Sequence, residues 1–131
     1  MTSPWRYFNV MITALCAWRE ARGEGRDGIR SVLHVIENRA NAAGKSWAEI
    51  VYAKWQFSSM TAPGDPELDL IPKAPDPIFE ECCELADAIF DDKDFDLTQG
   101  ATHYFADSIP MPSWAAAMTQ TVKIGHQTFF K

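Results

Sequence analysis

The sequence predicts a helix-rich α+β fold, and three features of the chain support this prediction. Within the first 90 residues, three segments carry apolar residues at the spacing of one helix face. Short alternating runs of aromatic and β-branched residues, typical of strands, follow residue 100. A length of 131 residues with 47% hydrophobic residues suits a single core. We therefore expect one domain over residues 1–131.

Capping residues divide the helical part of the sequence. Asp27 is suited to cap the second helix and Gly44 to end it. Ser46 and Glu49 have the spacing of a capping box at the start of the third helix. Asp76 precedes a proline and suits the start of the fourth. The expected helices cover about residues 7–22, 27–42, 46–52 and 77–90.

The remaining segments are expected to be a loop and two strands. Five of the eight prolines lie in residues 58–77. Proline lacks a backbone N–H, so this segment is expected to be an extended surface loop without a regular helix. Residues 101–106 and 121–130 are expected to form extended strands.

Composition excludes several classes of protein. The formal net charge is −6, and the twelve Lys and Arg residues are scattered, which argues against nucleic-acid binding. No stretch reaches the roughly 18 apolar residues that cross a bilayer, so no membrane insertion is expected. The apolar run at residues 10–18 lacks the flanks of a signal peptide. Three cysteines, an odd number, do not suggest a secreted disulfide framework.

Residues 19–25 bring two carboxylates, two guanidinium groups and two glycines to the end of an apolar helix. If Glu20 faces a cleft there, partial desolvation can keep it protonated and ready to donate to a leaving oxygen. Glycosidic cleavage needs such a donor. The alternative is that Glu20 and Glu24 form surface ion pairs with neighbouring arginines, as most such charges do.

A set of ordered motifs resembles the spore cortex-lytic type of cell wall hydrolase. The motifs are Glu20-Ala21-Arg22-Gly23-Glu24 with Gly28 and Val35-Ile36-Glu37-Asn38-Arg39, then Gln56-Phe57-Ser58, then Ala101-Thr102-His103-Tyr104-Phe105-Ala106, then Pro112-Ser113-Trp114-Ala115, and last Ile124-Gly125-His126 with Phe129-Phe130. Together they span about residues 12 to 130, and their fixed order is far more specific than any single motif.

This resemblance implies a lysozyme-like fold and cleavage of the bond between N-acetylmuramic acid and N-acetylglucosamine. It also implies that Glu20 is the catalytic acid, since Glu20 matches the helix-borne glutamate of such enzymes. Glu24 lies one helical turn away and is the rival, which we interpret as a supporting, substrate-side carboxylate. Asp107 is the only other carboxylate beside a family-like motif.

Four further residues are expected at the substrate. Gln56 is suited to hydrogen-bond an acetamido group or hydroxyl, and Tyr104 to orient the sugar or stabilise charge at the anomeric carbon. Ser58 lies in the same motif as Gln56, and Trp114 lies in the motif Pro112-Ser113-Trp114-Ala115. Trp55, Phe57 and Trp114 have apolar faces that suit sugar rings, although Phe57 is more simply a core residue.

The mechanism favoured by the sequence is that of a lytic transglycosylase, which needs no second carboxylate because the muramic acid C6 hydroxyl attacks its own anomeric carbon. One alternative is a hydrolysing muramidase with a second carboxylate. Another is a glycan-binding or virion structural domain without activity. The expected partner is the peptidoglycan glycan strand, bound by a monomer. The expected setting is that of a bacteriophage endolysin, held in the host bacterial cytoplasm until released through the membrane.

Thiol and metal chemistry have weaker support. Cys16 with His34, or Cys82 with His103, are possible nucleophile–base pairs in composition only. Cysteines on apolar helix faces are usually inert. There is no His-His or Cys-Cys pair at ligand spacing, so neither a catalytic metal nor a cofactor is expected.

Overall fold

The first helix starts earlier than predicted. In the computed structural model, which describes residues 3–131, α1 covers Pro4–Ala21. Ser3 caps it by accepting a hydrogen bond from the Trp5 N–H at 3.2 Å, and Pro4 stands at the first helical position. These two residues extend the helix by one turn beyond the apolar pattern. Glu20 lies in its last turn, as predicted.

The prediction that Asp27 caps the second helix is wrong. Helix α2 covers Gly25–Ala43, and Glu24 occupies the N-cap position without a side-chain capping bond. Asp27 lies in the first turn, where it accepts a hydrogen bond from Arg30 Nη1 at 2.9 Å. Gly44 ends the helix in the left-handed conformation, as expected.

The other two caps are confirmed. Helix α3 covers Trp47–Val51, and Ser46 and Glu49 form the capping box. Helix α5 covers Pro77–Phe90, where the Asp76 carboxylate accepts a hydrogen bond from the Phe79 N–H at 2.9 Å. Both caps depend on residues within three positions of each other, so the local sequence is enough to predict them.

The segment 58–77 is more ordered than predicted. It contains one helical turn, α4 (Ser58–Thr61), and the 3₁₀ helix η1 (Pro66–Asp69), so the expectation that no regular helix forms here is wrong. Burial of Ser59 and Met60 against the helical core holds α4 in place. Two arginines at the end of α1 also bind the segment. Arg19 donates to the carbonyl oxygens of Ser59 and Leu70, and Arg22 pairs with Glu67.

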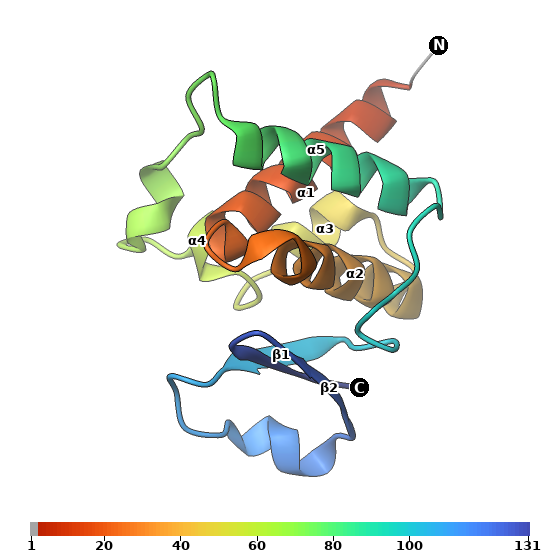
Figure 1. Cartoon of the computed structure of the whole chain (residues 1–131), viewed down its shortest axis with the longest axis vertical. Coiled ribbons are helices and arrows are strands. Elements are labelled where there is room, and N and C mark those ends of the chain that lie inside the picture. The colour runs from red at the N-terminus through yellow and green to blue at the C-terminus, as the bar shows by residue number, and fades with distance from the viewer. Residues whose placement is uncertain (1–2) are drawn as a thin grey trace.

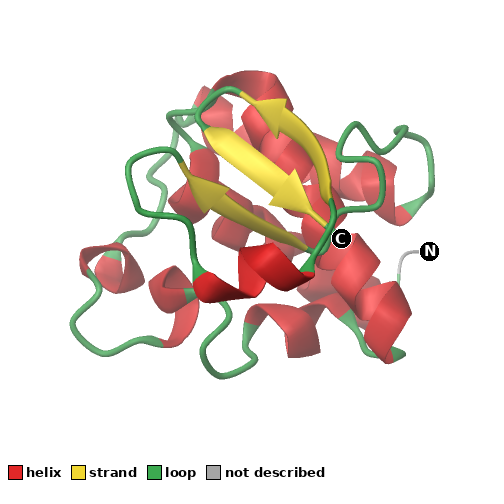
Figure 2. Cartoon of the chain, turned by 90° about the horizontal axis from the view of Figure 1, so that it is seen from below, coloured by secondary structure: helices red, strands yellow, loops and turns green. Residues whose placement is uncertain are grey.

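The C-terminal part forms one antiparallel sheet of three strands in the order β1-β3-β2 (Figure 2). Strand β1 is His103–Ala106, β2 is Gln120–Ile124 and β3 is Gln127–Phe130. The predicted second strand is therefore a hairpin that turns at Gly125, which has φ 58°. The 3₁₀ helix η2 (Ser113–Ala117) connects β1 to β2.

The α-helices gather on one side of the sheet, and the 3₁₀ helix η2 lies on its other side (Figure 1). Helix α1 packs against α5, α2 and α3 to form the main core. The second cluster joins Val35 of α2 to Ala101 and Phe129 beside the sheet. Helix α2 thus contributes to both cores. The predicted helix-rich α+β fold is confirmed. Within residues 3–131, no helix combines the length and apolarity needed to cross a bilayer.

Candidate active site

Glu20 and Tyr104 meet where the end of α1 faces strand β1. The Tyr104 hydroxyl donates a hydrogen bond to Glu20 Oε1 at 3.1 Å, although the two residues are 84 positions apart. Glu20 is half-buried. Burial, together with the Glu20 carboxylate, raises the pKa of Tyr104 well above its ordinary value. Tyr104 therefore keeps its proton and acts as a hydrogen-bond donor to Glu20.

The arginines near Glu20 have other partners. Arg19 binds loop carbonyl oxygens, Arg22 pairs with Glu67, and Arg26 Nη1 lies 3.7 Å from Glu81 Oε2. Among the described residues, no ion pair joins Glu20 or Glu24 to these arginines. The alternative in which Glu20 and Glu24 both form surface ion pairs with these arginines is therefore wrong.

A mostly buried guanidinium group links Gln56 to the sheet. Arg39 Nε donates to the Thr102 carbonyl oxygen at 2.5 Å, and Arg39 Nη1 donates to Gln56 Oε1 at 2.9 Å. Burial lowers the pKa of Arg39. Because arginine only donates, Gln56 must turn its oxygen toward Arg39, which leaves its NH₂ group to face a ligand. The contact between Arg39 and Gln56, which are 17 positions apart, has no signal in the local sequence.

One hollow, of about 560 Å³, contains the predicted residues Gln56 and Ser58. Its lining residues come from the turn before α4 and from the end of α4. They are Lys54, Trp55, Gln56, Ser58, Thr61, Ala62 and Pro63. Phe57, by contrast, is 2% exposed and belongs to the core, in agreement with its simpler interpretation.

A second hollow, of about 460 Å³, contains Glu24 together with Ala106, Asp107, Ser108 and His126. Asp107 Oδ2 lies 3.1 Å from Lys123 Nζ, so its charge is compensated. The two carboxylates that are candidates for assisting Glu20 therefore line the same hollow.

Gly28 leaves room for the side chain of Glu24, and Gly125 lies within contact distance of it. A methyl group at position 28 would overlap the Cβ of Glu24, and one at position 125 would lie 3.6 Å from Glu24 Oε2. Gly28 and Gly125 both belong to the family-like motifs. Packing against Glu24 gives Gly28 a physical reason, whereas the left-handed backbone at φ 58° gives one for Gly125.

The segment around strand β1 is linked to both hollows and to the Glu20–Tyr104 pair. Thr102, Tyr104 and Ala106 share one face of the strand because side chains alternate. Thr102 is joined through Arg39 to the Gln56 hollow, and Ala106 lines the Glu24 hollow. From Thr102 to Ala106 the strand rises about 13 Å. The contact between Tyr104 and Glu20 therefore belongs to the segment to which both hollows are linked, although neither residue lines them.

The structure does not bring Trp114 to this group. Trp114 in η2 packs with His103, Phe105 and Phe130, with ring centroids 5.1, 6.0 and 5.5 Å away. His103 and Phe105 alternate with Tyr104 along β1, so this aromatic cluster lies on the opposite face of the sheet. Binding of substrate by Trp114 stays a prediction, now with a packing role beside it.

Asn38 has a structural role. Its side-chain NH₂ donates to Asp96 Oδ2 at 2.8 Å and to the Ala101 carbonyl oxygen at 2.9 Å. These bonds fix the loop that leads from α5 into β1. Asn38 therefore supports the strand that carries Tyr104.

The surroundings of Cys16 and Cys82 disfavour the reactive thiolate form. Cys16 is fully buried, and burial, followed by the charge of Glu20, raises its pKa. Burial also raises the pKa of Cys82 to about 12.

The ring of His34, considered above as a base for Cys16, contacts Asp94: His34 Nε2 is 2.7 Å from Asp94 Oδ2. Over residues 3–131, no group of three or more His, Cys, Asp or Glu side chains has the arrangement of a metal site.

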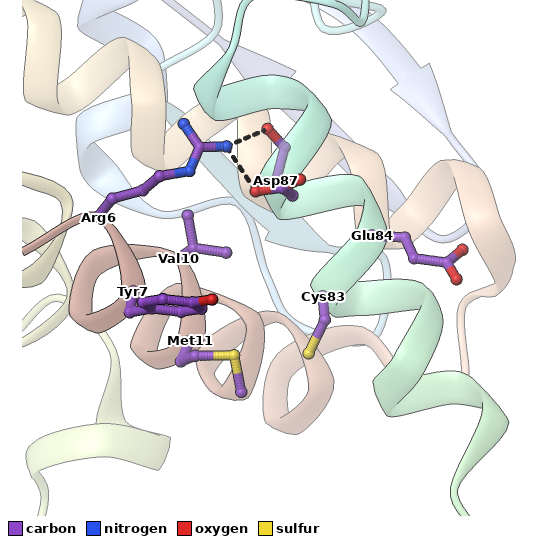
Figure 3. A pocket seen from close by; sticks show the side chains of 7 residues that line it. All are labelled: Arg6, Tyr7, Val10, Met11, Cys83, Glu84 and Asp87. Atoms are coloured by element: carbon purple, nitrogen blue, oxygen red, sulfur yellow. Dashed lines mark hydrogen bonds and ion pairs between the residues drawn. The ribbon is translucent and has the colours of Figure 1, made fainter. Parts of the chain in front are cut away.

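A third hollow, of about 360 Å³, lies between α1 and α5 (Figure 3). Arg6 reaches across it to Asp87, with Nη2 and Oδ1 2.5 Å apart. Its lining residues are Arg6, Tyr7, Val10, Met11, Cys83, Glu84 and Asp87. None of the predicted site residues is among them, so we assign the candidate active site to the Glu20–Tyr104 contact and to the two hollows that contain Glu24, Gln56 and Ser58.

Two solved structures resemble this fold. The catalytic domain of the germination-specific lytic transglycosylase SleB from Bacillus anthracis is 23% identical, with 99% of this chain and 97% of that chain covered and a TM-score of 0.74. The catalytic domain of the Bacillus cereus SleB protein is 22% identical, with 94% and 89% covered and a TM-score of 0.70. These matches confirm the predicted lysozyme-like fold. A comparison with curated proteins found no match.

The family model for cell wall hydrolases matches residues 23–130. Glu24 lies inside the matched range and Glu20 just before it. Because the match extends over most of the sequence, including four of the five ordered motifs in full, this chain belongs to the cell wall hydrolase family.

Proposed function

We propose that this protein cleaves the glycan strand of bacterial peptidoglycan as a lytic transglycosylase, with Glu20 as its acid and base. The observation that carries the proposal is the hydrogen bond from the Tyr104 hydroxyl to Glu20 Oε1, which joins the end of α1 to β1. Membership of the cell wall hydrolase family supports the substrate class. The B. anthracis structure of the same fold is described as a lytic transglycosylase domain.

The proposed reaction uses the two oxygens of Glu20 differently. Oε1 accepts the hydrogen bond from the Tyr104 hydroxyl, which leaves Oε2 to hold the proton that is transferred. Glu20 gives this proton to the glycosidic oxygen as the bond from that oxygen to the muramic acid C1 breaks. The C6 hydroxyl oxygen of the same sugar then bonds to C1, and its proton returns to Glu20. The product is a 1,6-anhydro sugar, and no water is consumed.

Other residues position the substrate in this scheme. The NH₂ group of Gln56, turned outward by Arg39, donates to an acetamido or hydroxyl oxygen. Ser58 lines the same hollow. Glu24 lies in the other hollow, where it contacts the part of the glycan strand beyond the scissile bond in this scheme.

Mass spectrometry of the soluble fragments released from purified peptidoglycan tests the proposal. Fragments with 1,6-anhydromuramic ends are expected. Reducing muramic ends would instead identify a hydrolysing muramidase, in which Glu24 or Asp107 holds the attacking water. Folded protein that releases no fragments, yet still binds peptidoglycan, would support the binding or virion structural alternative.

We also propose the endolysin setting, in which the enzyme waits in the host cytoplasm and acts after release through the membrane. Free thiols at Cys16, Cys82 and Cys83 suit folding in a reducing compartment. Cytoplasmic expression in a bacterium is expected to cause lysis only after the membrane is permeabilised. Lysis without permeabilisation would contradict this setting.

A further inference from the structure

Trp55 combines two unusual features. Its side chain is 86% exposed, more than any other large apolar side chain of the described residues, and its backbone has φ 68°. A left-handed backbone favours glycine or asparagine and is strained for a bulky residue. Core packing does not account for the strain, because the ring projects into solvent. Such an outlier motivates a search for function.

The space beside Trp55 is built for a ligand of mixed polarity. The hollow of about 560 Å³ joins this indole ring to the apolar Ala62 and Pro63 and to the polar Gln56 and Ser58. A pyranose ring presents an apolar face of C–H groups and a polar edge of hydroxyl and acetamido groups. An exposed indole suits the face, and an amide suits the edge.

The orientation of the Gln56 side chain makes the hollow selective for a ligand that carries a hydrogen-bond acceptor. Its Oε1 is taken by Arg39 Nη1 at 2.9 Å, so its NH₂ group is the one available to a ligand. The carbonyl oxygen of an acetamido group is the acceptor that distinguishes N-acetylated sugars from plain hexoses.

The contacts connect this hollow to the Glu20 centre. Gln56 is joined to Arg39, and Arg39 to the carbonyl oxygen of Thr102, which directly precedes β1. Hydrogen bonds therefore link this hollow to the segment that carries Tyr104, the donor to Glu20.

We propose that Trp55 is a stacking platform for one N-acetylated sugar ring, whose acetamido oxygen accepts a hydrogen bond from Gln56. This inference rests on the proposed function, since it names where part of that substrate binds. Lys54 Nζ lies 5.4 Å from the centroid of the indole ring. Such a contact is weak at an exposed site, and a sugar ring can displace it.

The test measures binding without cleavage. In a Glu20→Gln background, isothermal titration calorimetry measures the binding of a β-1,4-linked tetramer of N-acetylglucosamine. Trp55→Gly is expected to weaken binding about tenfold, and Trp55→Phe to weaken it less because an aromatic face remains. The thermal midpoint of Trp55→Gly is expected to stay or rise, because glycine relieves the strain at φ 68°. Trp5→Ala is the matched control, since Trp5 is 75% exposed on α1 and is expected to leave binding unchanged.

Binding of the tetramer with undiminished affinity by Trp55→Gly would overturn the inference, as would equal losses in Trp55→Gly and Trp5→Ala. The same holds if the Glu20→Gln parent shows no binding of the tetramer. Fragment release from peptidoglycan by the wild-type chain is scored separately. Fragment release with binding independent of Trp55 refutes the platform and leaves the proposed function intact. Trp55-dependent binding without fragment release refutes the reaction and keeps the platform.

Discussion

At the scale of single residues, the account depends on how the Glu20 carboxyl group is held. Tyr104 is its hydrogen-bond donor, and the arginines next to it in sequence bind elsewhere. Local sequence suggested those arginines as partners of Glu20. Only the approach of β1 to α1 supplies the tyrosine, and a contact over 84 positions has no local signal.

Tyr104→Phe removes one hydroxyl group and keeps the ring that packs against Phe129. We expect the rate of peptidoglycan cleavage to fall about tenfold to a hundredfold, because Glu20 loses the donor that orients it. The free energy of unfolding should fall by about 1 kcal/mol. Clearing of a peptidoglycan suspension measures the rate. Tyr7→Phe, at a residue that is 61% exposed, is the control, and an undiminished rate in Tyr104→Phe would refute the role of the hydroxyl.

At the scale of elements, caps formed by neighbouring residues were predictable and contacts between segments were not. Ser46 with Glu49, and Asp76, were found from sequence because each cap is local. The start of α2 was misplaced because Glu24 caps it without a side-chain bond. The order in segment 58–77 was missed because Arg19 and Arg22 impose it from α1.

Gly28→Ala tests the packing of Glu24 on the first turn of α2. The added methyl group overlaps the Cβ of Glu24, so one of the two must move. We expect the free energy of unfolding to fall by about 1–3 kcal/mol. Gly23→Ala is the matched control, since a methyl group there meets nothing within 4 Å. Denaturation by urea measures both variants, and equal stability of the two would contradict the packing described for Glu24.

The loop between α5 and β1 is expected to make the free energy of unfolding depend on pH in the acidic range. Burial alone would raise the pKa of Asp96, but the hydrogen bonds that its carboxylate accepts from Thr98, Asn38 and Gly100 outweigh burial and lower it. A lowered pKa in the folded state stabilises the fold at pH values above about 3.9, the pKa of an aspartate in the unfolded chain. This stabilisation is lost as the pH falls from there toward the pKa of Asp96 in the folded protein.

Asp96→Asn is the variant that tests this dependence. At pH 6 we expect it to lower the free energy of unfolding by about 1–3 kcal/mol, because its NH₂ group then faces other donors. The difference from the wild type should shrink as pH falls below about 4. Asp69→Asn, at an exposed position in η1, is the control. A difference that is the same at pH 6 and at pH 3 would refute the role assigned to Asp96.

At the scale of the whole molecule, the resemblance of ordered motifs predicted that residues far apart in sequence share one site. The structure brings Glu20 and Tyr104 into contact, and Arg39 joins Gln56 to the carbonyl oxygen of Thr102, two positions before Tyr104. Trp114 stays apart because alternation along β1 places its partners on the other face of the sheet. Side-chain direction in a sheet depends on register, which the motifs alone do not supply.

The net charge of −6 predicts a particular salt dependence. Cell walls are anionic, so the enzyme and its substrate repel each other at low ionic strength. Raising the salt concentration from about 10 mM to about 150 mM shortens the screening length from roughly 30 to 8 Å. We expect peptidoglycan clearing to speed up over this range. Binding of the uncharged N-acetylglucosamine tetramer should not change, and slower clearing at higher salt would contradict the prediction.

The central claim is that Glu20, and not Glu24, is the acid. The most direct measurement is the initial rate of fragment release from purified peptidoglycan by Glu20→Gln and Glu24→Gln, each with its thermal midpoint. We predict that Glu20→Gln lowers the rate at least about a thousandfold, and that Glu24→Gln stays within about tenfold of the wild type. A folded Glu20→Gln with the wild-type rate, or a folded Glu24→Gln with no measurable rate, would contradict the assignment.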